Sequence, residues 1–374
     1  MNYDYEDKSL LFHFACSLTP GIGPLKFQKL KNFFDSYEDA FDSKIDTLSK
    51  IVGYKEAVAL RQIINEDKIR QLLDKYHTKN IYVIHQASHL YPNKLRSISD
   101  PPICLFVKSR FNPEKYFLEL NNTVLLAVVG SRKHTTYGRV ATENIVSLLA
   151  TSGILIVSGM ALGIDSIAHI TTLKNGGKTL AILGCGVDMV YPPENRSLYE
   201  SIVGSENCII SEFLPGTPPT KGSFIARNRI ISGVSTGTII IEGDERSGSL
   251  TTAGFAAEQD RDVFALPGPI TSPLSQAPLR LLKSGAFLIT QPEDILEFYK
   301  LGSKNKTSAI KTELTPEETR IKDSLIKESL FIDDLVKNSG MSIQEVTNTL
   351  TGLEIKGIVG RDDFGKYHLL YILT

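Results

Sequence analysis

The sequence has no tryptophan and only four cysteines among its 374 residues. None of the cysteines belongs to a C-x-x-C pair, and no Cys/His spacing matches a zinc site. These absences argue against a zinc module, so we expect buried thiols in a reducing compartment and no bound metal. The cysteines are Cys16, Cys104, Cys185 and Cys208.

An excess of charge of one sign is also missing. Lysine and arginine number 41 against 42 aspartates and glutamates, which gives a net charge of −1. A strongly basic whole-chain signature is thereby excluded, and any nucleic-acid site must come from local clustering. The apolar runs are strand-sized, far shorter than the roughly 20 residues of a membrane helix. Because the acidic N-terminus lacks the basic segment of a signal peptide, we expect a cytoplasmic protein without a membrane partner.

The chain divides by pattern into four zones. Residues 1–80 read as helices, and residues 81–300 contain the first strand and then an α/β alternation. Residues 301–313 are polar, with three lysines, two serines and two threonines, which is typical of a linker. Residues 314–374 form a small C-terminal unit.

The central zone alternates short apolar runs with helical stretches. Buried strands that read as continuous apolar runs between helices indicate a parallel sheet covered on both faces, a Rossmann-like α/β fold. Ligands in such folds bind at the carboxyl ends of the strands, so the residues after each run are the candidate site. The runs lie at residues 124–129, 154–157, 179–183, 208–210, 238–241 and 263–266.

Glycine follows three of these runs, and two cations follow the first. A helix is expected to begin near Thr136, so that its N-terminal amides could face an anion. Tight turns alone would explain any one glycine loop, but not the adjacent cations, so we predict phosphate binding. The candidate residues in these loops are Gly130, Ser131, Arg132, Lys133, Ser158, Gly159 and Gly186.

A second cluster occupies residues 221–229 and combines cations with one aromatic ring. Arginine and lysine suit phosphates, and an exposed ring offers a stacking face for a base, so we predict a nucleic-acid contact here. The alternative is that Phe224 belongs to the core and that the arginines pair with acids such as Glu212 or Glu242. The candidate residues are Lys221, Phe224, Arg227, Asn228 and Arg229.

The sequence does not match the common motifs of nucleotide-binding enzymes and cofactor sites. Gly177-Lys178-Thr179 resembles the end of a P-loop, but it lacks the first glycine and enters a strand instead of following one. The dinucleotide fingerprint is incomplete after Gly186, because Met189 occupies its third glycine position. Asp165 and His169 are four residues apart, and we expect a mutual hydrogen bond that braces the preceding loop. We predict no catalytic residue and no cofactor.

The two flanks resemble small nucleic-acid-binding modules. Gly21-Ile22-Gly23 separates two helical patterns and is similar to a helix-hairpin-helix turn, whose amides grip a phosphate; the alternative is a plain connection. Helices at residues 316–327, 331–339 and 342–356 precede strands at 358–361 and 367–370, which is a winged-helix pattern. Residues 313–374 hold 7 lysines and arginines against 11 aspartates and glutamates. Because a duplex-reading winged helix is basic, we expect a protein contact or a regulatory role.

Taken together, the spaced motifs resemble the DprA family, also called Smf, the bacterial DNA-processing proteins of natural transformation. The resemblance runs nearly end to end. It rests on Val129-Gly130-Ser131-Arg132, Ser158-Gly159-Met160-Ala161-Leu162-Gly163-Ile164-Asp165, Leu183-Gly184-Cys185-Gly186, Tyr191-Pro192, Phe224-x-x-Arg227-Asn228-Arg229, Ser247-Gly248-Ser249-Leu250-x-Thr252 and Ala265-Leu266-Pro267-Gly268.

The resemblance implies a protein without catalytic activity that binds and protects incoming single-stranded DNA, helps load the RecA recombinase, and dimerises through the Rossmann-like domain. It implies phosphate contact by Arg132 and strand contacts by Lys221, Phe224 and Arg227. A competing function is nucleotide processing, because the core is also similar to the lysine-decarboxylase-like phosphoribohydrolases. Their double glycine and following glutamate are missing here, since Glu258 comes too late.

Overall fold

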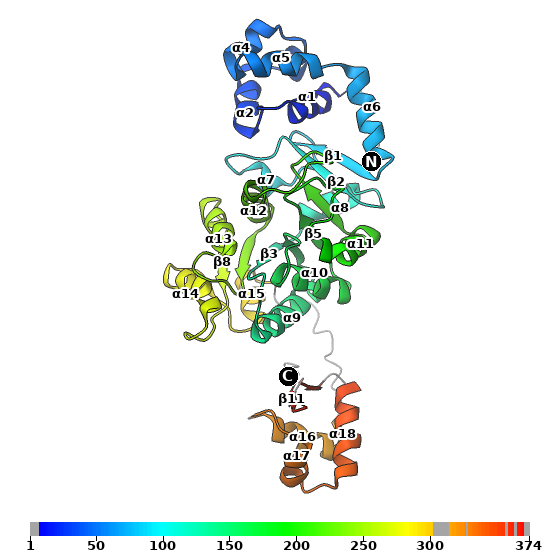
Figure 1. The fold of residues 1–374 in the computed structure, drawn as a ribbon, viewed down its shortest axis with the longest axis vertical. Helices are drawn as coiled ribbons and strands as arrows, with labels where there is room; N and C mark the ends of the chain where they lie inside the picture. Colours follow the sequence, from blue (N-terminus) through cyan, green and yellow to red (C-terminus); the bar gives the residue numbers. More distant parts are fainter. Residues whose placement is uncertain (1–6, 302–313, 327, 356–357, 363–364, 370–374) are drawn as a thin grey trace. The chain divides into compact units, whose positions relative to one another are not determined.

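The computed structural model describes residues 7–301, 314–326, 328–355, 358–362 and 365–369. They belong to two compact units, Met1–Lys300 and Leu301–Thr374, which are described separately (Figure 1). The division proposed at residue 80 falls inside the first unit, between its last N-terminal helix and its first strand. Within the described residues, no helix combines the length and the apolar character needed to cross a membrane.

The first unit begins with a group of short helices that shares a core with one edge of a sheet. Asp7, Ser36 and Asn65 cap three of the helices with their side chains, as expected at N-termini. Buried side chains such as Phe12 and Phe27 belong to the same apolar cluster as strand residues of the sheet. The helices are α1 (Lys8–Leu18), α2 (Pro24–Phe33), α3 (Tyr37–Asp42), α4 (Ile45–Val52), α5 (Tyr54–Ile63) and α6 (Glu66–His77).

A nine-stranded sheet forms the centre of this unit, in the order β1-β2-β6-β5-β4-β3-β7-β8-β9. The seven strands from β6 to β9 run parallel, whereas β2 pairs antiparallel with both β1 and β6. The strands are β1 (Ile81–His85), β2 (Cys104–Lys108), β3 (Leu125–Val129), β4 (Leu155–Ser158), β5 (Thr179–Ile182), β6 (Cys208–Ser211), β7 (Gly237–Ile240), β8 (Asp262–Ala265) and β9 (Phe287–Leu288).

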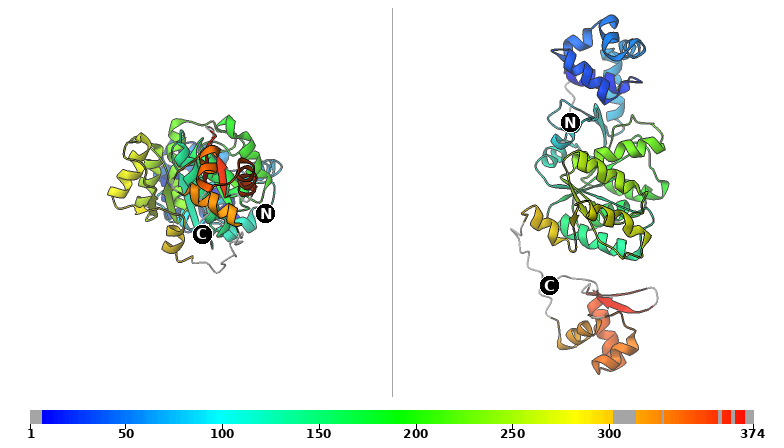
Figure 2. Two further views of the ribbon diagram at one scale, coloured as in Figure 1. Left: turned by 90° about the horizontal axis from the view of Figure 1, so that it is seen from below. Right: turned by 90° about the vertical axis from the view of Figure 1, so that its left-hand side faces the viewer.

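The predicted parallel sheet is confirmed, because each of the six apolar runs of the central zone is a strand. Helices cover both faces: α9, α10 and α11 lie on one side, α12 and α13 on the other (Figures 1 and 2). The helices of this part are α7 (Asn93–Arg96), α8 (Glu114–Leu120), α9 (Thr136–Thr151), α10 (Ile164–Lys174), α11 (Arg196–Gly204), α12 (Lys221–Val234), α13 (Gly248–Glu258), α14 (Gln276–Lys283) and α15 (Glu293–Phe298), with 3-10 turns at Pro193–Asn195 and Pro273–Ser275.

The strand order reverses at β3. The chain leaves β3 through α9 toward β4 on one side, whereas β7 pairs with β3 on the other side. At such a reversal the loops after the two central strands diverge and leave a crevice at the carboxyl edge of the sheet. This topology places the loops after β3 and β7 on either side of one crevice.

The second unit is a winged helix, as predicted. Helices α16 (Pro316–Leu325), α17 (Ile332–Ser339) and α18 (Ile343–Ile355) precede the hairpin of β10 (Val359–Arg361) and β11 (Tyr367–Leu369). A capping box between Thr315 and Glu318 begins α16. Ile321, Leu335 and Val346 belong to its separate apolar core. The predicted element ends at residues 327, 356 and 370 lie outside the described residues.

Candidate nucleic-acid interface

The loop after β3 is fixed to β7 by the carboxylate of Glu242. Thr135 caps α9, donates its backbone N–H to Glu242 Oε2 at 2.9 Å and donates its hydroxyl to Oε1 at 2.6 Å. Glu242 is buried and lies so close to Gly138 that an added Cβ there would come within 2.3 Å of Oε2. The anion at the start of α9 is therefore the chain's own carboxylate, not the external one that the sequence suggested.

The loop after β4 is braced by Asp165 and interlocks with the loop after β3. Asp165 accepts hydrogen bonds from the amides of Gly159 at 3.1 Å and Ala161 at 3.4 Å. Burial raises the pKa of this carboxyl, and the charge of Arg227 together with these amides opposes the shift. Gly163, at φ +83°, lies against the backbone of Ser131, where a Cβ would come within 2.3 Å of the carbonyl oxygen.

His169 does not pair with Asp165, so that expectation is wrong. Its Nδ1 lies 2.7 Å from the hydroxyl of Thr179, at the start of β5. The Asp165 carboxylate is instead turned toward the loop amides that precede it. Burial, with a smaller contribution from the charge of Arg227, lowers the pKa of His169 to about 3, so the imidazole is neutral at physiological pH.

Arg227 connects the ends of β4 and β5 from below the surface. It is only 5% exposed, and its Nη1 donates to the carbonyl oxygens of Gly159 and Ile182. Its Nε donates to the side chain of Asn228 at 3.1 Å. Burial lowers the pKa of this guanidinium, and Asp165 opposes the shift. Gly159 has no room for a side chain, because a Cβ would lie within 2.3 Å of the same guanidinium.

Arg229 is engaged in ion pairs beneath α12. It is 7% exposed, and its guanidinium lies 3.0 Å from Asp100 and 2.5 Å from Glu212. The pairing with Glu212 is the alternative that the sequence left open for these arginines. Because both partners are protein carboxylates, this guanidinium is not presented to a ligand.

An aromatic platform lies over the loops after β4 and β5. Phe224, in the first turn of α12, packs against Gly184, and its ring centroid is 5.3 Å from that of Tyr191 with the planes 31° apart. Tyr191 is 41% exposed. The guanidinium of Arg132 lies 5.9 Å from the centroid of Phe224. The platform, defined as Tyr191, Phe224 and Arg132, thus combines stacking rings with an exposed cation.

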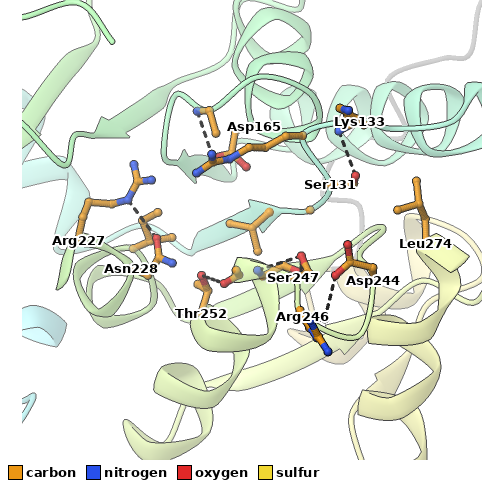
Figure 3. Close-up of a pocket in the computed structure, with 17 residues that line it drawn as sticks. Ser131, Lys133, Asp165, Arg227, Asn228, Asp244, Arg246, Ser247, Thr252 and Leu274 are labelled. Atoms are coloured by element: carbon orange, nitrogen blue, oxygen red, sulfur yellow. Dashed lines mark hydrogen bonds between the residues drawn. The ribbon is translucent and has the colours of Figure 1, made fainter. Parts of the chain in front are cut away.

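A cavity of about 440 Å³ adjoins the platform at the crevice between the loops after β3 and β7. The segment from Asp244 to Thr252 faces the loop of Ser131 and Lys133 across it, with Arg227 and Asn228 at one end and Leu274 at the other (Figure 3). Arg132 and Arg227 line both this cavity and a smaller one of about 250 Å³ beside Tyr191 and Phe224. The two hollows are therefore neighbours along one edge of the sheet.

Comparison with known proteins agrees with this architecture. Residues 82–300 match the family model "DNA recombination-mediator protein A", and residues 305–363 match "DprA winged helix domain". The chain belongs to the DprA/Smf family. It is 37% identical to protein Smf of Escherichia coli over 286 residues, which cover 74% of this chain and 75% of that protein.

Two solved structures resemble this DprA-family chain. DprA from Streptococcus pneumoniae is 31% identical, with a TM-score of 0.65, and the match covers 78% of this chain and 97% of that one. DprA from Helicobacter pylori is 28% identical, with a TM-score of 0.52, and covers 59% of this chain and 95% of that one. The Helicobacter structure is described as revealing a single-stranded DNA binding mode.

The structure separates the predicted site residues of this DprA-family chain into three groups. The first group lines the two cavities; in it Arg132 and Lys133 are exposed, Phe224 and Asn228 are half-buried, and the others are Gly130, Ser131, Gly159 and Arg227. Lys221 is exposed at the first position of α12 and lines neither cavity. Ser158, Gly186 and Arg229 lie inside the scaffold.

Ser158 and Gly186 show why the scaffold group cannot reach a ligand. Ser158 is fully buried and donates its hydroxyl to the carbonyl of Val128 at 2.7 Å. A Cβ on Gly186 would come within 2.7 Å of the Leu214 carbonyl oxygen, so this glycine permits close packing of two loops. Both residues shape the strand ends, and neither offers a free group at the surface.

Several lining residues escaped the sequence reasoning. Tyr191 lies outside the predicted site, and so do Asp244, Arg246, Ser249 and Thr252 in the segment after β7. The rule that ligands bind after the carboxyl ends of the strands, which predicted Gly130, would also have predicted the residues of this segment. Within the described ranges, no three His, Cys, Asp or Glu side chains are grouped so that they could hold a metal ion.

The helix-hairpin-helix-like turn holds an internal carboxylate. Gly21, at φ +84°, and Gly53, at φ +101°, both lie against the side chain of Glu56. Lys26, at the start of α2, pairs with Glu56 at 2.7 Å. The positive charge of Lys26 beside this turn is therefore partly balanced by Glu56. Contact of this turn with a DNA phosphate stays a prediction.

Proposed function

We propose that this protein binds single-stranded DNA on the platform of Tyr191, Phe224 and Arg132, protects the strand and helps to load RecA on it during natural transformation. The observation that carries the proposal is the pair of aromatic rings next to an exposed guanidinium. They lie at the carboxyl edge of the sheet, where further cations are exposed. Rings provide a sequence-tolerant stacking surface for bases, and cations attract the phosphates.

The family relationship supports the proposal. The Helicobacter relative is described by its single-stranded DNA binding mode, and the matching family is named for recombination mediation. We extend to this chain the RecA partnership, a homodimer through the Rossmann-like domain and a cytoplasmic location. The site residues that we propose for contact are Gly130, Ser131, Arg132, Lys133, Lys221, Phe224 and Asn228, with Tyr191 added and Arg227 as support.

We propose a binding protein in preference to a nucleotide hydrolase. Asp165, a carboxylate that lines the cavity, accepts hydrogen bonds from loop amides, and Asp244 accepts one from the amide of Arg246 at 2.8 Å. Glu258 ends α13, at the opposite end of that helix from the cavity. Steady release of free base from a panel of nucleotides would instead support the enzyme.

The proposal is tested by titrating labelled single-stranded and duplex oligonucleotides at two salt concentrations. Single-strand affinity should fall with salt, because each phosphate contact releases counterions, and Arg132→Ala should lower both the affinity and the salt slope. Lys174→Ala is the matched control, since this exposed lysine ends α10, near the amino ends of the strands. Equal losses in the two variants, or salt-independent binding, would contradict the site.

A further inference from the structure

The smaller hollow beside the platform has two walls, which come from separate segments of the chain. Residues 159–162, in the loop after β4, form one wall of this cavity of about 250 Å³. Residues 191–194 form the other wall and carry the ring of Tyr191, and Phe224 also lines the hollow. Functional side chains are positioned by the hydrogen bonds of the groups behind them. The orientation of the Tyr191 ring therefore depends on the contact that holds the two walls together.

Asn195 supplies this contact from the end of the second wall. Its side chain is buried, and its Nδ2 donates to the backbone carbonyl of Met160 at 2.7 Å and to the hydroxyl of Ser166 at 2.9 Å. Since a carbonyl oxygen only accepts hydrogen bonds, the amide nitrogen and not the amide oxygen must face Met160. Ser166 in turn donates its hydroxyl to the carbonyl of Ala161 at 2.6 Å. Asn195 therefore holds two consecutive carbonyls of the first wall, one directly and one through Ser166.

Met160, in the first wall, has a backbone conformation that needs support from its neighbours. Its φ is +59°, in the left-handed region that residues other than glycine rarely adopt, because the side chain crowds the backbone there. Its side chain is buried in the same apolar cluster as Leu183 and Tyr199. Because the hydrogen bond from Asn195 fixes the direction of the Met160 carbonyl, its loss should let this backbone relax and displace the loop.

The place of Asn195 in the chain shows that its side chain serves this loop instead of its own helix. Asn195 is the N-cap residue of α11, a position at which an asparagine side chain normally accepts a hydrogen bond from an amide of the first turn. Among the described residues, no amide of α11 donates to it. The stabilisation that capping would give to α11 is thus replaced by the contact between the two walls.

We propose that Asn195 is a positioning residue for single-strand binding, which fixes the segment of Tyr191 against the loop after β4 so that a base can stack on the ring. The inference rests on the proposed function, because Tyr191 belongs to the platform. Asn195 is buried and lines neither cavity, so it acts on the strand through Tyr191. Its loss should weaken the part of binding that depends on bases and leave the phosphate contacts of Arg132 and Lys133 in place.

The test uses the full chain and an oligothymidine that carries 2-aminopurine, whose fluorescence falls when this base stacks on an aromatic ring. At saturating protein the parent should quench the probe strongly, and Tyr191→Ser, which removes the ring, should quench it least. Asn195→Ala should give intermediate quenching and about tenfold weaker single-strand binding, with the salt slope of the parent. Ser166→Ala, which leaves the direct bond to Met160, should change both quantities less, and it carries the test if Asn195→Ala does not fold.

Asn207→Ala is the matched control, because Asn207 is also buried and makes two hydrogen bonds away from the platform. Asn207 accepts the amide of Thr179 at 2.6 Å and donates to the hydroxyl of Ser205 at 3.0 Å. Thermal unfolding should show similar destabilisation of Asn195→Ala and Asn207→Ala, but only Asn195→Ala should reduce the quenching.

Three outcomes would overturn the inference while the proposed strand binding stands. They are a parent that binds the strand without quenching, quenching by Asn195→Ala and Ser166→Ala equal to that of the parent, and an equal loss of quenching in Asn207→Ala. A parent that does not bind the strand at all would overturn the proposed function, and the inference with it.

Discussion

At the scale of single residues, Glu242 decides the shape of the strand edge. Its carboxylate receives two hydrogen bonds from Thr135 and fills the space beside Gly138. A phosphate ligand at this helix start would have to displace a buried anion. The exposed cations Arg132 and Lys133 lie earlier in the same loop, so they are the groups available to contact a DNA strand.

The contact between Glu242 and Gly138 predicts a coupling that a double-mutant cycle can measure. Gly138→Ala should destabilise the protein by about 1–3 kcal/mol, because the new methyl group meets the carboxylate. In a Glu242→Ala background the same substitution should cost much less, since the clashing group is gone. Urea unfolding of the four proteins gives the coupling; strictly additive effects would contradict the contact.

The buried histidine His169 predicts a dependence of stability on pH. Its pKa is lowered to about 3 in the folded protein, whereas an unfolded histidine titrates near 6.5. As pH falls below about 6.5 the unfolded chain takes up a proton that the folded chain refuses, so the unfolding free energy drops by about 1.4 kcal/mol per pH unit.

His169→Gln isolates this contribution from other titrating groups. Other groups with shifted pKa values are present in both proteins. The pKa values of His13 and His85 are also lowered, and those of Asp165 and Glu212 are raised. Between about pH 7.5 and pH 5 the variant should therefore lose less stability than the parent in urea unfolding. Equal losses in the two proteins would show that His169 is protonated in the folded state.

At the scale of elements, helix α12 positions the platform. Thr220 and Ser223 form a capping box at its start, and the hydroxyl of Ser223 also donates to the carbonyl of Gly184 at 2.5 Å. This fixes the first turn, which carries Phe224, to the loop after β5. The same helix buries Arg227 and Arg229, so one element supplies both the surface and its support.

Thr220→Ala tests this coupling between capping and binding. Loss of the cap should cost about 1 kcal/mol of stability, and single-strand affinity should fall because the first turn of α12 frays. Thr315→Ala, which removes the matching cap of α16 in the winged helix, is the control for binding. The two variants should lose stability alike in their own units, but only Thr220→Ala should weaken the strand; unchanged strand affinity would contradict the role of the cap.

Much of the element pattern could be predicted from the sequence because buried parallel strands leave a continuous apolar signal. The strand β2 was missed, since Cys104–Lys108 is a short antiparallel addition outside that alternation. The site was harder to predict from the sequence than the elements. Arg132 and Arg227 look equivalent in sequence, yet one is exposed and the other hydrogen-bonds to two carbonyls, because tertiary packing alone decides which arginine is buried.

At the scale of the whole molecule, the chain combines two units with different charge. The cavity and the platform lie in the first unit, and the winged helix has its own core. Residues 313–374 carry 7 lysines and arginines against 11 aspartates and glutamates. An acidic module contributes little to phosphate attraction, and a protein contact or a regulatory role for it stays a prediction.

Truncation after Lys300 should therefore leave strand binding nearly intact. We expect single-strand affinity within about twofold of the full chain and the same salt slope, because the phosphate contacts remain. Anisotropy titration at two salt concentrations checks both quantities, and thermal unfolding of the truncated chain checks that the first unit is folded. A tenfold loss of affinity in a folded truncated chain would show that the winged helix contacts the strand.

The central claim is that the rings of Tyr191 and Phe224, at the edge of the sheet, hold the bases of a single strand. It is tested most directly by comparing the affinities of the parent protein and Phe224→Ala for one oligonucleotide, single-stranded and as a duplex. The substitution should remove about 1–3 kcal/mol of single-strand binding and leave weak duplex binding unchanged. An unchanged single-strand affinity, in a variant that unfolds like the parent, would contradict the account.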